Sequence, residues 1–136
     1  MFFKKNLNKT KNGDLIKVAA LLIHAAKIDE NYSKVEEVII KQALLKIGAN
    51  NQNIQSIIDE GKIIEENANQ ILDFTREVKN MDEKNKIKIV ETLWQIIYSN
   101  KQADMYETNL MRRLAGLLYI DNKIMGSIKE KIKNEN

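Results

Sequence analysis

Apolar residues recur at every third or fourth position along most of the chain, and no segment alternates apolar and polar residues over several positions. This spacing is typical of α-helices with a buried face, whereas strands show a period of two. It predicts helices over residues 15–27, 34–47, 51–60, 65–79, 83–97 and 105–118, and a last one from about residue 122. The pattern therefore predicts an all-α fold, a single compact bundle of about six to seven helices, with no β-sheet.

The first predicted helix, residues 15–27, is apolar nearly all round, because Ala19, Leu21 and Ile23 lie outside its main apolar stripe. A helix without a polar face belongs at the centre of a domain. His24, the only histidine, lies within this helix and has no partner in a nearby motif. We therefore expect a structural role for His24.

Helix ends must be read from capping residues and glycines, because the chain has no proline and only five glycines. Ser33 and Glu36 form the capping box S-x-x-E, which is typical of a helix start. Gly48 is expected to end that helix, and Gly61 to end the short helix that follows it. Asp82 is expected to cap the helix over residues 83–97.

An internal repeat is the most informative feature, since residues 22–50 align with residues 93–121 without a gap, at an offset of 71. Glu36 then meets Glu107, and each copy reads as a helix, a polar turn and a capped helix. Heptad-like patterns are common, so two unrelated helical hairpins of similar length could also align. The matching turn length and glutamates favour a true repeat. The prediction is two helix–acidic turn–helix repeats, over about 15–48 and 82–119, around buried central helices.

The length of 136 residues suits one domain, which we place at residues 14–136 behind a flexible basic tail at residues 1–13. The absence of cysteine gives no reason to expect an oxidising compartment, so we expect a cytoplasmic protein. The longest nearly apolar run, residues 18–26, is far shorter than the roughly 20 residues that cross a bilayer. At the N-terminus apolar residues precede the lysines, the reverse of a signal peptide.

The formal net charge of +3 is concentrated in the tail. Four lysines, which carry a charge of +4, precede the first acidic residue. The remaining residues, 12–136, therefore have a formal net charge of 3 − 4 = −1. A nucleic-acid binder is expected to carry its basic stripe on the folded surface. Nucleic acid is therefore not expected as a partner.

Catalytic machinery is not indicated. The sequence contains no G-x-x-x-x-G-K-[ST], G-x-G-x-x-G, H-E-x-x-H or G-x-S-x-G motif. Paired acids such as Glu65 and Glu66 lie next to each other, and adjacent residues on a helix do not face each other. We expect a protein that is not an enzyme.

Two stretches carry a resemblance to a known family. The second copy of the repeat reads Leu93-Trp94-Gln95-Ile96-Ile97-Tyr98-Ser99-Asn100-Lys101, then Glu107, then Leu110-Met111-Arg112-Arg113-Leu114-Ala115-Gly116-Leu117-Leu118. The first copy has Ala26-Lys27-Ile28-Asp29-Glu30, then Ser33 and Glu36. These stretches resemble the TerB-like domain of tellurite-resistance proteins, also found at the start of some membrane-anchored co-chaperones. In that family each hairpin turns through A-D-G-x-x-x-x-x-E, and the second is followed by a helix similar to L-x-R-R-I-A-x-L-L.

The resemblance implies a site for a hard divalent cation, calcium or magnesium, in the acidic turns, because these ions need several oxygen ligands held together. The residues at the matching or neighbouring positions are Asp29, Glu30, Glu36, Asp104 and Glu107. Asn100 replaces the family's aspartate and Lys101 its glycine, so we expect the site to be weakened or lost. Helix capping accounts for Glu36, Asp104 and Glu107 without any metal.

Three functions remain open. The leading one is a non-catalytic interaction module for protein partners, which the resemblance places in stress-response assemblies near the membrane, with Arg112 and Arg113 or the basic tail making contacts. The alternative is a metal-responsive binding domain that uses the acidic turns. The third is weak attachment to a lipid surface through residues 2–5, Phe-Phe-Lys-Lys. The sequence indicates neither the partner nor the oligomeric state.

Overall fold

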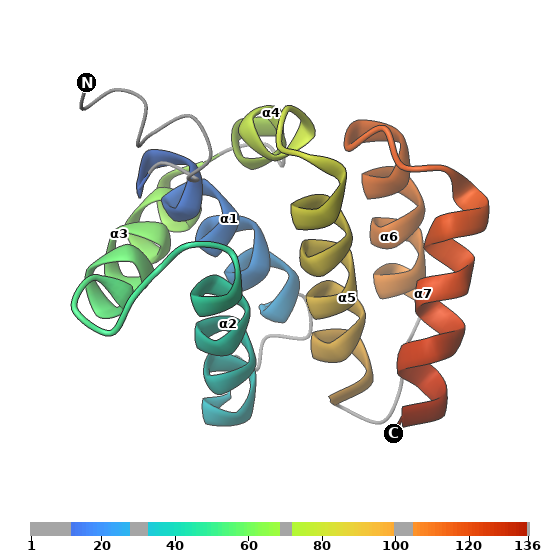
Figure 1. Ribbon diagram of the computed structural model, residues 1–136, viewed down its shortest axis with the longest axis horizontal. Coiled ribbons are helices and arrows are strands. Elements are labelled where there is room, and N and C mark those ends of the chain that lie inside the picture. Colours follow the sequence, from blue (N-terminus) through green and yellow to red (C-terminus); the bar gives the residue numbers. More distant parts are fainter. Residues whose placement is uncertain (1–11, 28–32, 69–71, 100–104, 136) are drawn as a thin grey trace.

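The computed structural model describes residues 12–27, 33–68, 72–99 and 105–135, and within these ranges all regular structure is helical (Figure 1). The helices are α1 Asn12–Ala26, α2 Lys34–Lys46, α3 Ile54–Asn67, α4 Leu72–Lys79, α5 Glu83–Ser99, α6 Met105–Leu117 and α7 Asn122–Glu135. The predicted all-α bundle is confirmed. None of the helices in this part of the chain is long and apolar enough to cross a membrane.

Helices α1 and α5 form the centre of the bundle, which confirms the prediction for α1. Helix α1 packs against α2, α3, α4 and α5, and α5 also packs against α2 and α7. Figure 1 shows α3 at one end of the long axis and α6 with α7 at the other. Every residue of α1 from Val18 to Ile23 is at most 1% exposed, which explains why its sequence has no polar face.

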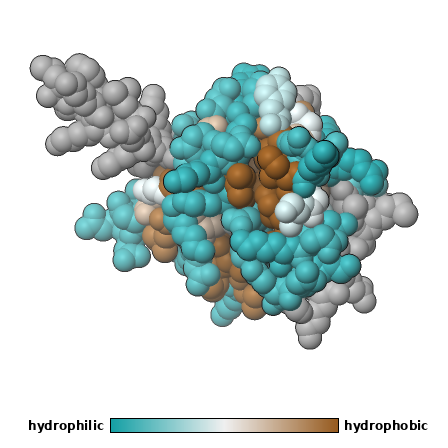
Figure 2. Space-filling model, turned by 45° about the vertical axis from the view of Figure 1, so that its right-hand side comes forward, coloured by the Kyte–Doolittle hydropathy of each residue, from teal (hydrophilic) through white to brown (hydrophobic). Residues whose placement is uncertain are grey.

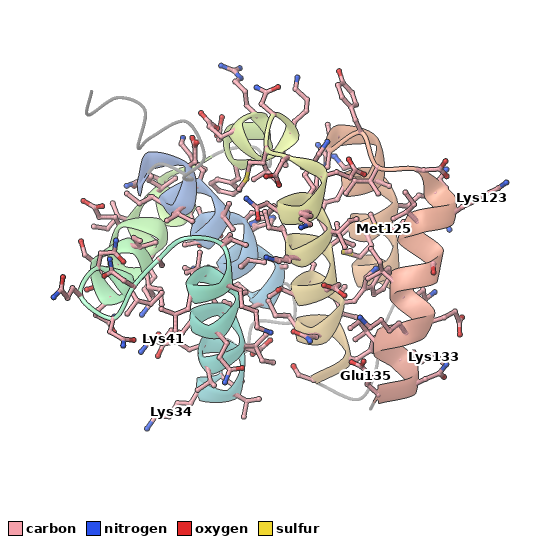
Figure 3. All side chains as sticks on the ribbon, in the orientation of Figure 1. Lys34, Lys41, Lys123, Met125, Lys133 and Glu135 are labelled. Carbon is pink, nitrogen blue, oxygen red and sulfur yellow. The ribbon has the colours of Figure 1, made fainter. Side chains whose placement is uncertain are left out.

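Charged side chains cover the outer faces of the peripheral helices (Figure 3). Lys34 projects from α2 and Lys133 from α7, whereas Met125 of α7 is buried in the core. This division follows the sequence pattern, in which lysines and acids fill the positions between the apolar stripes.

The prediction that Gly61 ends a helix is wrong. Helix α3 continues through Gly61 to Asn67, and Gly61 is buried where α3 crosses α1. A Cβ atom at Gly61 would lie 2.8 Å from the Cβ of Ala19 and 3.2 Å from the backbone nitrogen of Ala20. Glycine is present because it lets the two backbones approach, and it costs about 1 kcal/mol of helix propensity relative to alanine. The helix predicted over 65–79 is accordingly divided between the end of α3 and the short α4.

The ends of α2 and α6 confirm the internal repeat. Gly48 has a φ of 134°, and Tyr119, 71 positions later, has a φ of 57°. The amide of Ala49 donates to the carbonyl of Leu44 at 2.9 Å, and the amide of Ile120 donates to the carbonyl of Ala115, also at 2.9 Å. Both sets of contacts match the Schellman motif, in which the residue after the helix takes a positive φ.

The repeat extends one helix further than predicted. Asn50 precedes α3, and its side-chain oxygen accepts from the amide of Gln52 at 2.9 Å. Asp121 precedes α7, and its carboxylate accepts from the amide of Lys123 at 2.7 Å. These pairs are again 71 residues apart. The fold is therefore two three-helix units, α1–α3 and α5–α7, joined by α4.

Candidate functional site

The capping box at the first acidic turn is confirmed. The Oε1 atom of Glu36 accepts from the Ser33 amide at 2.8 Å, and the Ser33 hydroxyl accepts from the Glu36 amide at 3.2 Å. Glu36 is fully buried, and its second oxygen, Oε2, has no hydrogen-bond partner among the described residues. A buried carboxylate oxygen without a partner is costly. Capping therefore accounts for one oxygen of Glu36 and leaves the other unexplained.

The remaining predicted metal ligands are not placed by the structure. Asp29, Glu30 and Asp104 lie outside the described residues, and Glu107 belongs to α6 but its side chain lies outside the described part as well. The same holds for Asn100 and Lys101 and for residues 1–11, which include the residues predicted to bind lipid. Among the described residues, no group of three or more His, Asp or Glu side chains could hold a metal ion. The metal site stays a prediction.

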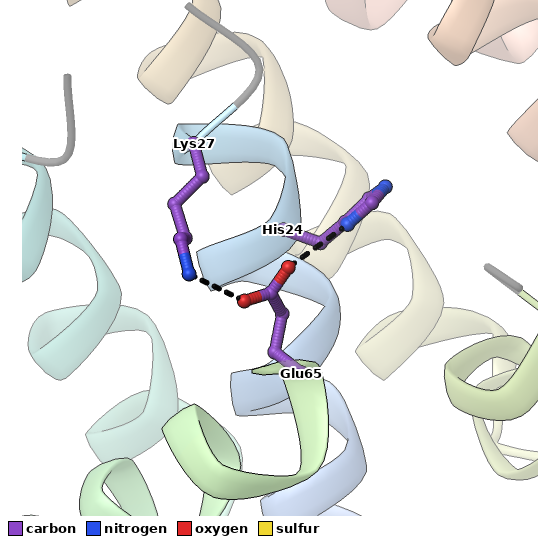
Figure 4. Close-up of polar contacts among 3 residues, drawn as sticks. All are labelled: His24, Lys27 and Glu65. Carbon is purple, nitrogen blue, oxygen red and sulfur yellow. Dashed lines mark hydrogen bonds and ion pairs between the residues drawn. The ribbon is translucent and has the colours of Figure 1, made fainter. Parts of the chain in front are cut away.

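His24 belongs to a polar cluster at the end of α1 (Figure 4). Its Nδ1 lies 3.2 Å from Oε2 of Glu65, and Nζ of Lys27 donates to Oε1 of the same carboxylate at 2.7 Å. Burial acts to raise the pKa of Glu65, but the hydrogen bonds from Lys27 and His24 outweigh it and leave that pKa below its usual value. The ring of His24 also packs against Phe74 of α4, with centroids 5.8 Å apart. The cluster links α1 to α3. A structural role for His24 was predicted from the sequence, but its partners were not.

Arg112 and Arg113 lie on the outer face of α6, and both are exposed. Neither forms an ion pair with another residue in the described ranges. The two arginines, one turn before Gly116 and Leu117, therefore present to solvent two cations that no described carboxylate pairs with. The sequence singled out this pair, and the structure places it beside a cleft.

The cleft lies between α4 and the end of α6 and has a volume of about 330 Å³. Its lining residues are Thr75, Arg76 and Lys79 of α4, and Gly116, Leu117 and Tyr119. None of the described residues that line it is acidic. Arg76 is exposed, and Nζ of Lys79 lies 5.3 Å from the ring centroid of Tyr119. The cleft therefore has a basic α4 wall and an aromatic edge.

Tyr119 is unusual in both backbone and exposure. It is the one non-glycine residue with a positive φ in the described ranges, and it is 72% exposed, more than any other large apolar or aromatic side chain there. The face that carries α6 and α7 shows apolar surface between hydrophilic rims (Figure 2). The sequence most simply predicts Tyr119 at the core or its edge with its hydroxyl near water, but the side chain is largely exposed. The repeat, which aligns Tyr119 with Gly48, carried the signal of its unusual backbone.

A lysine from α5 holds the C-terminal end of α6 beneath the cleft. Lys86 is 7% exposed, and its Nζ donates to the carbonyl of Leu118 at 3.1 Å. Carbonyls at helix C-termini lack partners within the helix, so a lysine there satisfies both the hydrogen bond and the helix dipole. This contact positions the turn that carries Tyr119.

The structure is a small all-α domain with an internal repeat and a surface cleft beside the helix that carries Arg112 and Arg113. The family model described as tellurite resistance protein TerB matches residues 15–130, most of the chain. The chain therefore belongs to the TerB family, and the resemblance seen in the sequence is confirmed. No curated protein and no solved structure gives a significant match.

Proposed function

We propose that the chain is a non-catalytic helical interaction module that works in a stress-response or membrane-proximal assembly. The observation that supports it is the set of cations at one surface, Arg112 and Arg113 on α6 with Arg76 and Lys79 across the cleft on α4. Arginine is enriched at protein interfaces, and unpaired surface cations favour association with acidic partners. The TerB family supports a helical module of this kind.

The test is capture of protein partners in the presence of a chelator. Wild-type chain is compared with the double variant Arg112→Glu, Arg113→Glu and with the control Lys34→Glu, Lys133→Glu, which makes the same change of charge at exposed positions far from the cleft. We expect the cleft variant to lose a partner that the control retains. Equal capture by all three proteins would contradict a role for this surface.

A second function is favoured by the unpartnered oxygen of Glu36. A divalent cation bound at the first acidic turn would give Oε2 a ligand role, with Asp29 as the neighbouring carboxylate. The melting temperature of metal-stripped protein is measured with calcium, magnesium, manganese or zinc, beside the double variant Asp29→Asn, Glu36→Gln. A saturable rise for one cation that the variant loses supports metal binding, because a specific ligand stabilises the state it binds. No rise at millimolar metal would leave Glu36 as a helix cap.

A further inference from the structure

The side chain of Tyr119 is not part of the hydrophobic core. Its positive φ is unfavourable for any residue with a Cβ atom, and the equivalent position in the first unit is Gly48, which avoids that cost. Its side chain is 72% exposed, so it contributes little to the core. Backbone strain of this kind is concentrated at functional sites, and exposed tyrosines are enriched among the residues that dominate binding.

The surroundings of Tyr119 suit a docked segment with negative charge. Arg76 and Lys79 line one wall of the cleft, and Arg112 and Arg113 continue the basic surface along α6. Gly116 lies between these cations, and nothing comes within 4 Å of the position that a Cβ atom would take there. A partner helix could therefore contact the backbone of α6 at Gly116, with acidic side chains on either side facing these cations.

Helix α3 of the same chain carries a surface with the complementary chemistry. Asp59, Ile63 and Glu66 are spaced i, i+4 and i+7 on its outer face, with Glu60 beside them, and all four are exposed. Ile63 is 58% exposed, an apolar side chain at the centre of an acidic stripe. The one basic residue of α3, Lys62, is bound to Glu37 of α2 at 3.2 Å.

Helix α2 carries a second group of exposed apolar residues, but its charge does not complement that of the cleft. Val35, Val38 and Leu45 are exposed on α2. That helix also carries Lys34, Lys41 and Lys46, which would repel the arginines of α6. Charge therefore selects the outer face of α3.

We propose that the outer face of α3 in one copy of the chain docks into the α4–α6 cleft of a second copy. Ile63 packs against Tyr119, and the carboxylates of Asp59, Glu60 and Glu66 lie opposite Arg76, Arg112 and Arg113. Helix α3 lies at one end of the long axis and α6 lies toward the other (Figure 1), so one copy can use both surfaces at once. Contacts of this heterologous type join copies head to tail. The inference rests on the proposed function and names the partner of that surface.

The experiment is sedimentation equilibrium of the purified chain over a wide concentration range, at low and high salt. The cleft variant is Arg112→Glu, Arg113→Glu, and the α3 variant is Asp59→Lys, Glu60→Lys. Each variant alone has lost one of the two surfaces and is expected to remain monomeric. Their equimolar mixture pairs an intact cleft with an intact α3 face, and the reversed charges of the two altered surfaces also complement each other, so association is expected to return in the mixture. Wild type is expected to show a rising average mass that high salt suppresses, and the control Lys34→Glu, Lys133→Glu to behave like wild type.

Tyr119→Gly separates binding from folding. We expect this variant to lose association while its melting temperature rises, a combination that damage to the fold cannot produce. A wild-type chain that stays monomeric up to millimolar concentration at low salt overturns the inference, and so does a mixture of the two variants that stays monomeric. If the monomeric chain still captures another protein through Arg112 and Arg113, the proposed function stands and only self-association is overturned.

Discussion

Gly48 and Tyr119 occupy the same position of the two structural units, the second residue after a helix, and both have a positive φ, 134° and 57°. The two turns make equivalent hydrogen bonds, yet one is made by glycine and the other by a large exposed aromatic residue. The positive φ and the hydrogen bond that closes the turn are therefore repeated, while the side chain at that position differs between the two units. That difference indicates a local role for Tyr119 beyond closing the helix.

Tyr119→Gly is expected to increase the free energy of unfolding by about 1 kcal/mol. Removing the left-handed strain gains roughly 1–2 kcal/mol. Loss of the exposed cation–π contact with Lys79 costs about 0.5–1 kcal/mol and offsets part of that gain. Urea unfolding of the two proteins measures the difference. The reciprocal control, Gly48→Ala, is expected to decrease stability by about 1 kcal/mol, and a stabilising Gly48→Ala would refute this account of the turn.

Gly61→Ala is expected to destabilise the protein by about 1–2 kcal/mol. The added methyl group would meet Ala19 at 2.8 Å and two backbone atoms within 3.3 Å, so α3 must move away from α1. Overpacking of this kind costs about 1–3 kcal/mol. The higher helix propensity of alanine offsets up to about 1 kcal/mol of that cost. Thermal unfolding followed by circular dichroism is the measurement. The matched control is Gly126→Ala in α7, where the methyl group enters open space and is expected to stabilise the helix.

Glu65→Gln is expected to lower stability at neutral pH by about 1–2 kcal/mol, because Lys27 and His24 lose a charged acceptor. The pKa of Glu65 is held below its usual value of 4.5, so its contribution is present above that value and is lost as the pH falls through the lower folded-state pKa. The stability difference between wild type and variant should therefore shrink as the pH falls below about 4.5. Denaturant titrations at a series of pH values test this. Glu66→Gln, at the exposed neighbouring residue, is the control, and an equal pH dependence in both variants would argue against the cluster.

Lys86→Met is expected to destabilise the protein by about 1–2 kcal/mol. The variant keeps the shape of the side chain but leaves the carbonyl of Leu118 without its donor in a buried environment. Lys88→Met is the control, because Nζ of Lys88 lies 3.4 Å from the carbonyl of Lys46 in an exposed contact and should contribute less. Hydrogen exchange at the end of α6 should increase in the Lys86 variant and not in the control.

Local patterns were sufficient for most of the helices. The capping box at Ser33, the end of α2 at Gly48 and the start of α7 at Asn122 were all predicted correctly, since each depends on residues within a few positions in the chain. Gly61 was misread for the same reason. A glycine that ends a helix and a glycine that admits a neighbouring helix look identical in sequence, and only the position of Ala19 separates them.

The same distinction between local patterns and tertiary contacts applies to the candidate site. The sequence alone determined the all-α class, the TerB family and the repeat at an offset of 71, because periodicity and motif spacing are properties of consecutive residues. Only the tertiary structure decided that Arg76 and Lys79 lie across a cleft from Tyr119, that Glu65 holds His24 and Lys27, and that Lys86 reaches Leu118. These contacts join residues roughly 30 to 40 positions apart, brought together by the way helices cross in the packed core, which no local pattern encodes.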